Sequence, residues 1–400
     1  MSIDNSSPLR PQKLWTKDFT LATSVNFIIS FVFYLLMPTM ALYAVDAFGS
    51  NNTVSGLAAS AFIFGAIGSR AFAGKFLDLL GRKRMLLWCL AIYIAAAACY
   101  VLADNATTLI ILRVIHGFGF GASSTVVTAA VMARIPAQRK AEGTGYFGIS
   151  TTLATACGPL VAIFLINSRG YHDLFFFTSI VSALAFVIAL FIDYAERTPT
   201  QAEIDNKWNF SLSSFLDRNT LPLASIMLLA GFAYSSVLSF LTSFAKDEGF
   251  TSAAGKFFLV YAIGVLAARL FIGRIQDRHG DNIVIYPILA SFVISFAILG
   301  FAQSDLHVLI SAVFAAFGFG ALMPAVQAVV IGSAPAHMVG LATSTFYLTL
   351  DLGTGIGPIL LGLVIPSWGY QGMYLAMAVL CIVIIPLYYV VHGRHVRRAG

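Results

Sequence analysis

The chain contains twelve apolar stretches, each long enough to cross a lipid bilayer as a helix. Apolar residues make up 58% of its 400 residues and charged residues only 10%, whereas about a quarter of the residues in soluble domains are charged. A helical crossing takes about 20 residues. The pattern therefore predicts an all-α membrane protein with twelve transmembrane helices, at 19–43, 53–74, 84–103, 107–132, 143–167, 171–192, 220–244, 253–274, 282–302, 306–332, 338–365 and 369–391.

Three sequence motifs occur twice, at a constant separation of 199 residues. The pairs are 70–81 with 269–280, 118–121 with 317–320, and Gly158-Pro159 with Gly357-Pro358. A constant register of this kind indicates an internal duplication. It predicts two pseudo-symmetric six-helix bundles, 1–192 and 220–400, joined by a polar cytoplasmic linker at 193–219. The space between two such bundles is where transporters bind their substrates.

Basic residues are concentrated on one side of the predicted helices. Lys and Arg close to a span resist translocation, and most of the 24 basic residues fall on the side that holds both termini. We therefore expect a multi-pass protein of the cell membrane, an inner membrane, with both termini in the cytoplasm. The same asymmetry accounts for the net charge of +6, so no nucleic-acid partner is expected.

The sequence offers little support for metal or cofactor chemistry. Its four cysteines, Cys89, Cys99, Cys157 and Cys381, lie in predicted spans and show neither metal-ligand nor disulfide spacing. An enzyme would need clustered nucleophiles, bases or metal ligands, which the spacing does not indicate. We expect no metal, no cofactor and no enzymatic activity, and we expect the chain to act as a monomer.

The phrase at the end of the second predicted helix resembles the loop signature of the major facilitator superfamily. Its residues are Gly74, Asp78, Gly81, Arg82, Lys83 and Arg84, with Asp277 in the degenerate copy of the second half. Asp78 can meet these cations or a helix N-terminus of the other half, so the phrase predicts an inner gate loop that latches one bundle against the other. The alternative is a positive-inside anchor with a local ion pair.

Two further motifs resemble the same family. Residues 109–119 are similar to its helix 4 motif, whose arginine, here Arg113, is buried and implicated in proton coupling. Gly158-Pro159 resembles the core of its antiporter motif, and Gly357-Pro358 is the fuller repeat copy. We expect both pairs to act as helix hinges. The resemblance covers residues 19–391 and implies the twelve-helix major facilitator fold, in its drug:proton antiporter branch.

Arg113 and His116 lie about one turn apart inside the apolar zone of the fourth predicted helix. An uncompensated charge there is costly, so both side chains are expected to face a wet cavity and to take part in proton coupling or, for Arg113, in substrate binding. The alternative is an arginine that backbone carbonyls satisfy in a packed interior.

Asp351 is the one carboxylate deep within a predicted span. A buried carboxylate beside a movable cation can load and release a proton, which makes Asp351 the leading candidate for proton coupling. Arg70 is its expected partner, because the resembled family sets helix 2 beside helix 11; the alternative is a static ion pair. Arg269, the repeat mate of Arg70, is expected either to bind an anionic group of the substrate or to bond the backbone of helix 5.

Polar residues on helices 1, 7 and 10 are candidates for the substrate cavity, since the resembled family lines its cavity with these helices. They are Asn26, Tyr34, Tyr43, Tyr234 and Gln327. Each of them taken alone is also explained as a packing or interfacial residue.

The combined pattern predicts a secondary active transporter that exports a small organic molecule by proton antiport and alternating access. Three intramembrane arginines against one acid favour an anionic or zwitterionic cargo. The alternatives on the same fold are a proton symporter or an exporter of a nutrient, sugar or metallophore. A membrane-embedded enzyme and a non-transporting receptor are the rivals of other classes.

Overall fold

The computed structural model describes residues 14–135, 140–194, 196, 198, 201–205, 216–334 and 339–395. These residues form helices and no strand. The α-helices are α1 (Lys17–Phe48), α2 (Asn52–Leu80), α3 (Arg82–Cys99), α4 (Ala106–Arg134), α5 (Lys140–Arg169), α6 (Tyr171–Leu190), α7 (Gln201–Asp205), α8 (Leu221–Asp247), α9 (Thr251–His279), α10 (Asp281–Gly300), α11 (Asp305–Ala315), α12 (Ala321–Ser333) and α13 (Val339–Val391). Three short turns are η1 (Tyr100–Leu102), the π-helical η4 (Ala316–Gly320) and η5 (Gly393–His395).

The described helices supply twelve membrane crossings. Eleven helical segments are long and apolar enough to cross a bilayer, one of them formed jointly by α11, η4 and α12. The last helix, α13, has 53 residues and is interrupted at Gly369, whose φ of 68° lies in the left-handed region. It therefore provides two crossings rather than one. The predicted all-α fold class is confirmed.

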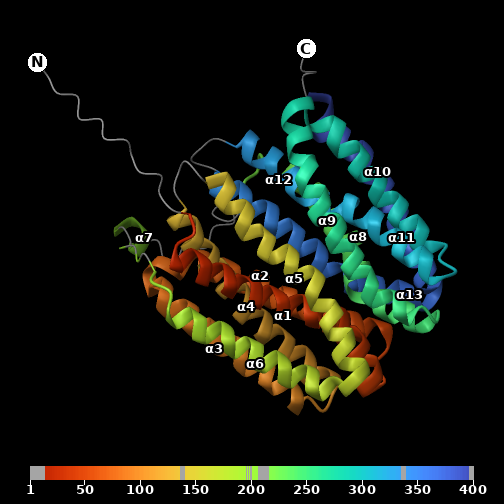
Figure 1. Cartoon of the computed structure of the whole chain (residues 1–400), viewed down its shortest axis with the longest axis horizontal. Coiled ribbons are helices and arrows are strands. Elements are labelled where there is room, and N and C mark those ends of the chain that lie inside the picture. Colours follow the sequence, from red (N-terminus) through yellow and green to blue (C-terminus); the bar gives the residue numbers. More distant parts are fainter. Residues whose placement is uncertain are drawn as a thin grey trace, which may run out of the picture.

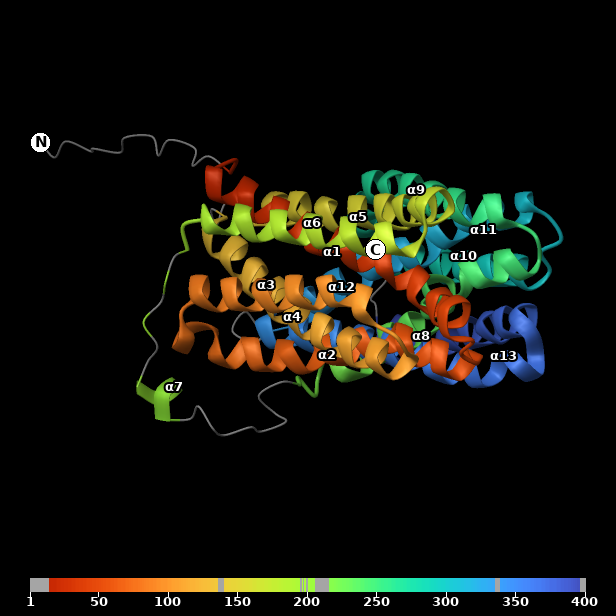
Figure 2. The same cartoon turned by 90° about the horizontal axis from the view of Figure 1, so that it is seen from below.

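The helices gather into two bundles, as Figures 1 and 2 show. One holds α1–α6, coloured red to yellow-green, and the other holds α8–α13, coloured green to blue, with α7 apart from both. The bundles meet through α2 against α13, α5 against α9 and α1 against α8. The exact bundle limits at 192 and 220 stay a prediction. The end of the protein at which α1 begins and α13 ends is called the terminal end. The opposite end is called the distal end.

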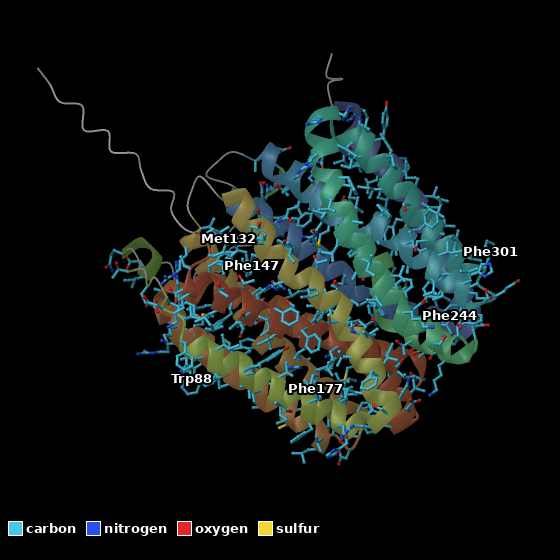
Figure 3. All side chains as sticks on the ribbon, in the orientation of Figure 1. Trp88, Met132, Phe147, Phe177, Phe244 and Phe301 are labelled. Carbon is cyan, nitrogen blue, oxygen red and sulfur yellow. The ribbon has the colours of Figure 1, made fainter. Side chains whose placement is uncertain are left out.

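Large apolar side chains cover the outside of both bundles. Phe164, Phe176 and Leu270 are 69%, 62% and 66% exposed. Trp88 and Phe301 project from the outer edges of the first and second bundle in Figure 3. Soluble monomers rarely expose contiguous apolar surface on this scale. The outer surface is therefore suited to lipid.

The first bundle is held together by helices that cross at glycines. A methyl group added at Gly65 of α2 would lie 2.0 Å from the carbonyl oxygen of Val114, and one added at Gly117 of α4 would lie 1.8 Å from that of Phe62. Only a residue without a side chain lets the two backbones approach this closely, as is typical of membrane helices. The α2–α4 crossing therefore depends on both glycines.

The two predicted hinges lie at equivalent crossings. A methyl group at Gly158 of α5 would meet the backbone of Leu35 in α1 at 2.8 Å, and one at Gly357 of α13 would meet the Ser235 hydroxyl of α8 at 1.9 Å. Pro159 and Pro358 follow them inside continuous helices. The two copies of the Gly-Pro motif thus pack at equivalent helix crossings in the two bundles. Hinge motion at these sites stays a prediction.

One repeated motif adopts two different backbones. Phe118–Gly121 is part of the regular helix α4, whereas its copy forms the π-helical turn η4. Pro324 follows η4 by four residues, and a proline removes the hydrogen bond to the carbonyl four residues earlier, here that of Gly320. Thr125 stands at the equivalent position of α4. We attribute the π turn, a feature frequent at functional sites, to Pro324.

Candidate functional site

An ion pair joins the two bundles near mid-depth. Arg70 Nη1 of α2 lies 3.3 Å from Asp351 Oδ2 of α13, and the two side chains are 29% and 20% exposed. The structure thus brings together the two residues that the sequence paired. The coupling role of Asp351 stays a prediction.

The Arg70–Asp351 contact is loosely made. Asp351 Oδ2 and Arg70 Nε are buried atoms without a hydrogen bond from any described residue. The guanidinium also faces the Phe120 ring, with its carbon 6.0 Å from the ring centre. A half-satisfied charge pair in a low-dielectric site is costly to keep. A proton can therefore neutralise Asp351, or a ligand group can take its place beside Arg70, with the loss of few hydrogen bonds.

Four tyrosines and a glutamine lie around this pair. Tyr34 and Tyr347 are within electrostatic range of both charges. Tyr347 Oη lies 3.5 Å from Gln327 Oε1, and Tyr234 and Tyr261 stack at 5.7 Å between ring centres. The predicted cavity residues Tyr34, Tyr234 and Gln327 therefore share one site between the bundles.

Arg269 approaches the same site from α9. Its Nη1 lies 3.2 Å from the point that a methyl group at Gly148 of α5 would occupy. No hydrogen bond or ion pair joins Arg269 to a described residue, and its buried Nε has no partner. Of the two expectations for this arginine, a bond to the helix 5 backbone is therefore wrong in this conformation, although the side chain does face that helix.

Arg113 and His116 lie elsewhere, inside the first bundle. Both residues are fully buried. Arg113 donates to the carbonyl oxygens of Ala58 and Ala59 at 3.1 and 3.2 Å, and its guanidinium covers the Phe62 ring at 4.7 Å. In this conformation neither side chain faces a cavity, because α2 carbonyls and aromatic rings surround them. Their role in proton coupling stays a prediction.

His116 is held by aromatic residues. Its Nδ1 lies 2.9 Å from the Tyr100 hydroxyl, and its ring lies 4.2 Å from that of Tyr93. Nε2 has no hydrogen bond from a described residue. The histidine therefore fastens η1 to α4 in a dry interior.

Two other cavity candidates serve the packing of the first bundle. The Asn26 amide donates to the hydroxyls of Ser150 and Thr151 on α5, at 2.9 and 3.1 Å. Tyr43 packs its ring against Tyr171 at 4.8 Å. Both residues tie α1 to neighbouring helices of its own bundle.

The terminal-end loop is organised by the linker. Gly81, with φ of 85°, separates α2 from α3. The Glu196 carboxylate accepts hydrogen bonds from the backbone N–H groups of Arg82 and Lys83, at 2.8 and 3.0 Å. Lys83 Nζ donates to the Leu190 carbonyl at 3.0 Å. The linker residue thus caps the otherwise unpaired N-terminus of α3.

Three residues of the predicted gate loop lie outside what the structure describes. Gly74 and Asp78 lie in helix α2, and Asp277 lies in helix α9. The structure describes their helical backbone and nothing further about them. Arg84 is exposed. The choice between latch and anchor therefore stays open.

Comparison with known proteins identifies the family. The family model of the Major Facilitator Superfamily matches residues 22–265 and 252–399. The chain belongs to this superfamily. It is 26% identical over 397 residues to the multidrug resistance protein MdtG of Enterobacter lignolyticus, covering 96% of this chain and 94% of that protein. It is 24% identical over 360 residues to the staphylopine export protein of Staphylococcus aureus, covering 84% and 87%.

Solved structures agree on the fold. The crystal structure of a POT family transporter in complex with a thioalcohol-conjugated peptide superposes with a TM-score of 0.80, at 16% identity, over 97% of this chain and 99% of that one. At this identity the likeness concerns the fold alone. As a member of the Major Facilitator Superfamily, the chain is a multi-pass membrane transporter and not an enzyme.

In this member of the superfamily, the bundles are closed at the distal end. Asp46 of α1 pairs with Lys246 of α8 at 2.7 Å, and the Tyr171 hydroxyl donates to the same carboxylate at 3.0 Å. Gly56 of α2 packs on the Pro358 carbonyl, to which an added methyl group would lie 2.1 Å away. The central site is therefore shut off from the distal side.

Sequence reasoning missed several residues of the central site. Tyr347 stands four residues before Asp351, one turn along the same helix face, and Tyr261 stands eight residues before Arg269. Helical spacing from the two charges could have found both. Gly148 of the central site and Glu196 of the terminal-end loop carry no such signal, because their partners lie on other helices.

Proposed function

We propose that this chain exports a small organic molecule in exchange for protons, with the two bundles opening alternately to either side of the membrane. The Arg70–Asp351 ion pair carries the proposal, since it joins α2 to α13 in the centre of the protein. Removal of one charge from a buried ion pair strongly destabilises the contact between the two elements that the pair joins.

Protonation of Asp351 is the proposed coupling step. A proton on the carboxylate removes its charge and weakens its attraction to Arg70, which lets the bundles separate. Arg113 and His116 are proposed to contribute indirectly, because Arg113 fixes α4 to the carbonyls of Ala58 and Ala59 on the helix that carries Arg70.

Export is supported by the relatives, whose names describe multidrug resistance and staphylopine export. Export of a polar metallophore is the second candidate, favoured by the similarity to the staphylopine export protein. Proton symport of a nutrient remains the alternative on this fold, since a single ion pair can serve either direction.

The direction of coupling can be measured with purified protein in proteoliposomes. We expect vesicles with an acidic interior to accumulate cargo, because protons leave as cargo enters. A panel of small carboxylates, zwitterions and lipophilic cations would be tested with and without the gradient. Accumulation only when the exterior is acidic would show symport and contradict the proposal, as would flux that ignores the gradient.

We also propose that the protein acts as a monomer in the cell membrane with both termini in the cytoplasm. The positive residues Arg82, Lys83 and Arg84 at the terminal end support this orientation. A fluorescent-protein fusion to the carboxyl end should fluoresce, and a dark fusion that is nevertheless expressed would contradict the orientation.

The distal ion pair provides a test of alternating access. Reversal of one charge, as in Lys246→Asp, should open the distal end, and the exchange Asp46→Lys with Lys246→Asp should close it again. The two side chains are 30% and 56% exposed, so the pair contributes at most about 1 kcal/mol, or roughly a five-fold change in population.

Spin labels at Ser50 and Glu248, in the two distal loops, report the opening as a longer distance between them. The double exchange is the control, because it restores attraction with both side chains altered. An unchanged distance distribution in the Lys246→Asp variant would show that the pair does not hold the distal end shut.

A further inference from the structure

The three arginines inside the membrane-spanning segments differ in their bonding partners. Arg113 donates to α2 carbonyls and Arg70 forms an ion pair with Asp351, although each keeps one buried nitrogen without a described partner. Arg269 makes no hydrogen bond or ion pair with a described residue. A charge left unpaired within a membrane is costly and marks a binding site. Arg269 is therefore the arginine that remains available for a ligand.

A cavity of about 150 Å³ lies beside Arg269, between α9 and α12. Its α12 wall consists of Ala321, Pro324, Ala325 and Ala328, whose small side chains leave the space open. Among the described residues that line the cavity, Arg269 is the one with a charge. The Gln276 amide at the cavity is already engaged, donating to Asp281 Oδ1 and to the Ala325 carbonyl at 2.8 and 3.1 Å. A cavity of this size accommodates a benzene ring.

A buried aromatic cluster adjoins the same helices. Phe319 of η4 lies parallel to Tyr234, with 4.0 Å between ring centres and 9° between planes. The π turn ends at Gly320, next to the cavity residue Ala321. Tyr261, which lies on α9 with Arg269, also stacks on Tyr234, with 5.7 Å between ring centres. These three rings are buried and do not line the cavity, so a planar or apolar ligand body would contact the apolar α12 wall.

We propose that the α9–α12 cavity binds the anionic end of the cargo, and that the cargo is a small organic carboxylate with a planar or apolar body. The Arg269 guanidinium would hold the carboxylate through two parallel N–H···O bonds, the geometry that arginine favours. The inference rests on the proposed transport function, because it names the class of molecule carried through the same site.

Binding of simple probes to the purified protein tests this site without any transport. Benzoate, benzamide and benzylamine share a ring and differ in charge. We expect benzoate to raise the unfolding temperature of the wild-type protein, whereas the neutral and cationic probes leave it unchanged. Arg269→Gln should weaken benzoate binding roughly ten-fold or more, since a charge-assisted hydrogen bond is lost. Arg269→Lys, which keeps the charge, should recover part of the affinity.

Arg274→Gln is the matched control, because Arg274 is an exposed arginine on the same helix. It should bind benzoate like the wild type. Equal binding of benzoate and benzamide, undiminished binding in Arg269→Gln, or no binding of benzoate to the wild type would each overturn the proposal. The binding measurement does not depend on proton coupling. A failure of pH-driven transport would therefore contradict the proposed function without contradicting the proposed binding site.

Discussion

Asp351→Asn is expected to abolish accumulation driven by a pH gradient, down to the level of empty vesicles, while exchange of cargo without a gradient continues. Asparagine has nearly the same shape as the protonated aspartic acid but cannot release a proton. The variant therefore resembles a protein in which residue 351 is permanently protonated and its attraction to Arg70 is weak. Gradient-driven uptake and gradient-free exchange in the same proteoliposomes measure the two properties separately.

Two further variants separate coupling from architecture. Glu248→Gln removes an exposed carboxylate at the distal end and should transport like the wild type. The double variant Arg70→Gln with Asp351→Asn removes the whole pair, which avoids the penalty of leaving one buried charge unpaired. We expect it to be as stable as the single variant or more so, and still uncoupled from protons.

The alternative outcomes have distinct meanings. Retained gradient-driven uptake in Asp351→Asn would move the coupling role away from this residue. Loss of both uptake and exchange in the single variant, with recovery of both in the double variant, would show a static ion pair that holds the bundles together.

Gly65→Ala is expected to destabilise the first bundle strongly. The added methyl group would lie 2.0 Å from the Val114 carbonyl oxygen. The helix backbone of α2 sets the position of the methyl carbon and that of α4 sets the position of the oxygen, so neither atom can rotate away. The α2–α4 crossing must therefore widen, which also disturbs the nearby bonds from Arg113 to α2. We expect a destabilisation of about 3 kcal/mol, at the upper end of the cost of overpacking.

The same helix offers a matched control. A methyl group at Gly68 meets no atom within 4 Å, so Gly68→Ala should leave the protein folded. Size-exclusion profiles of both variants in detergent, followed by thermal unfolding, give the comparison. A Gly65→Ala protein that elutes and melts like the Gly68→Ala protein would show that the crossing is not tightly packed.

The sequence determined the fold and one feature of the site. The apolar stretches specified the crossings, because a helix that spans lipid needs a fixed length, and the duplicated motifs specified two related bundles. The pairing of Arg70 with Asp351 was also predictable, from the similar depth of the two residues and from the resembled family, which sets helix 2 beside helix 11. A charge left unpaired inside a membrane is costly.

Only the tertiary structure decided how the remaining charges are used. It placed Arg113 against α2 carbonyls in a buried interior, left Arg269 beside a cavity, and brought Tyr347 to the central pair. Sequence pattern could not separate these cases, because membrane helices are apolar on nearly all faces. Their rotation is set by close packing of small residues, such as Gly65 and Gly117, and not by a hydrophobic stripe.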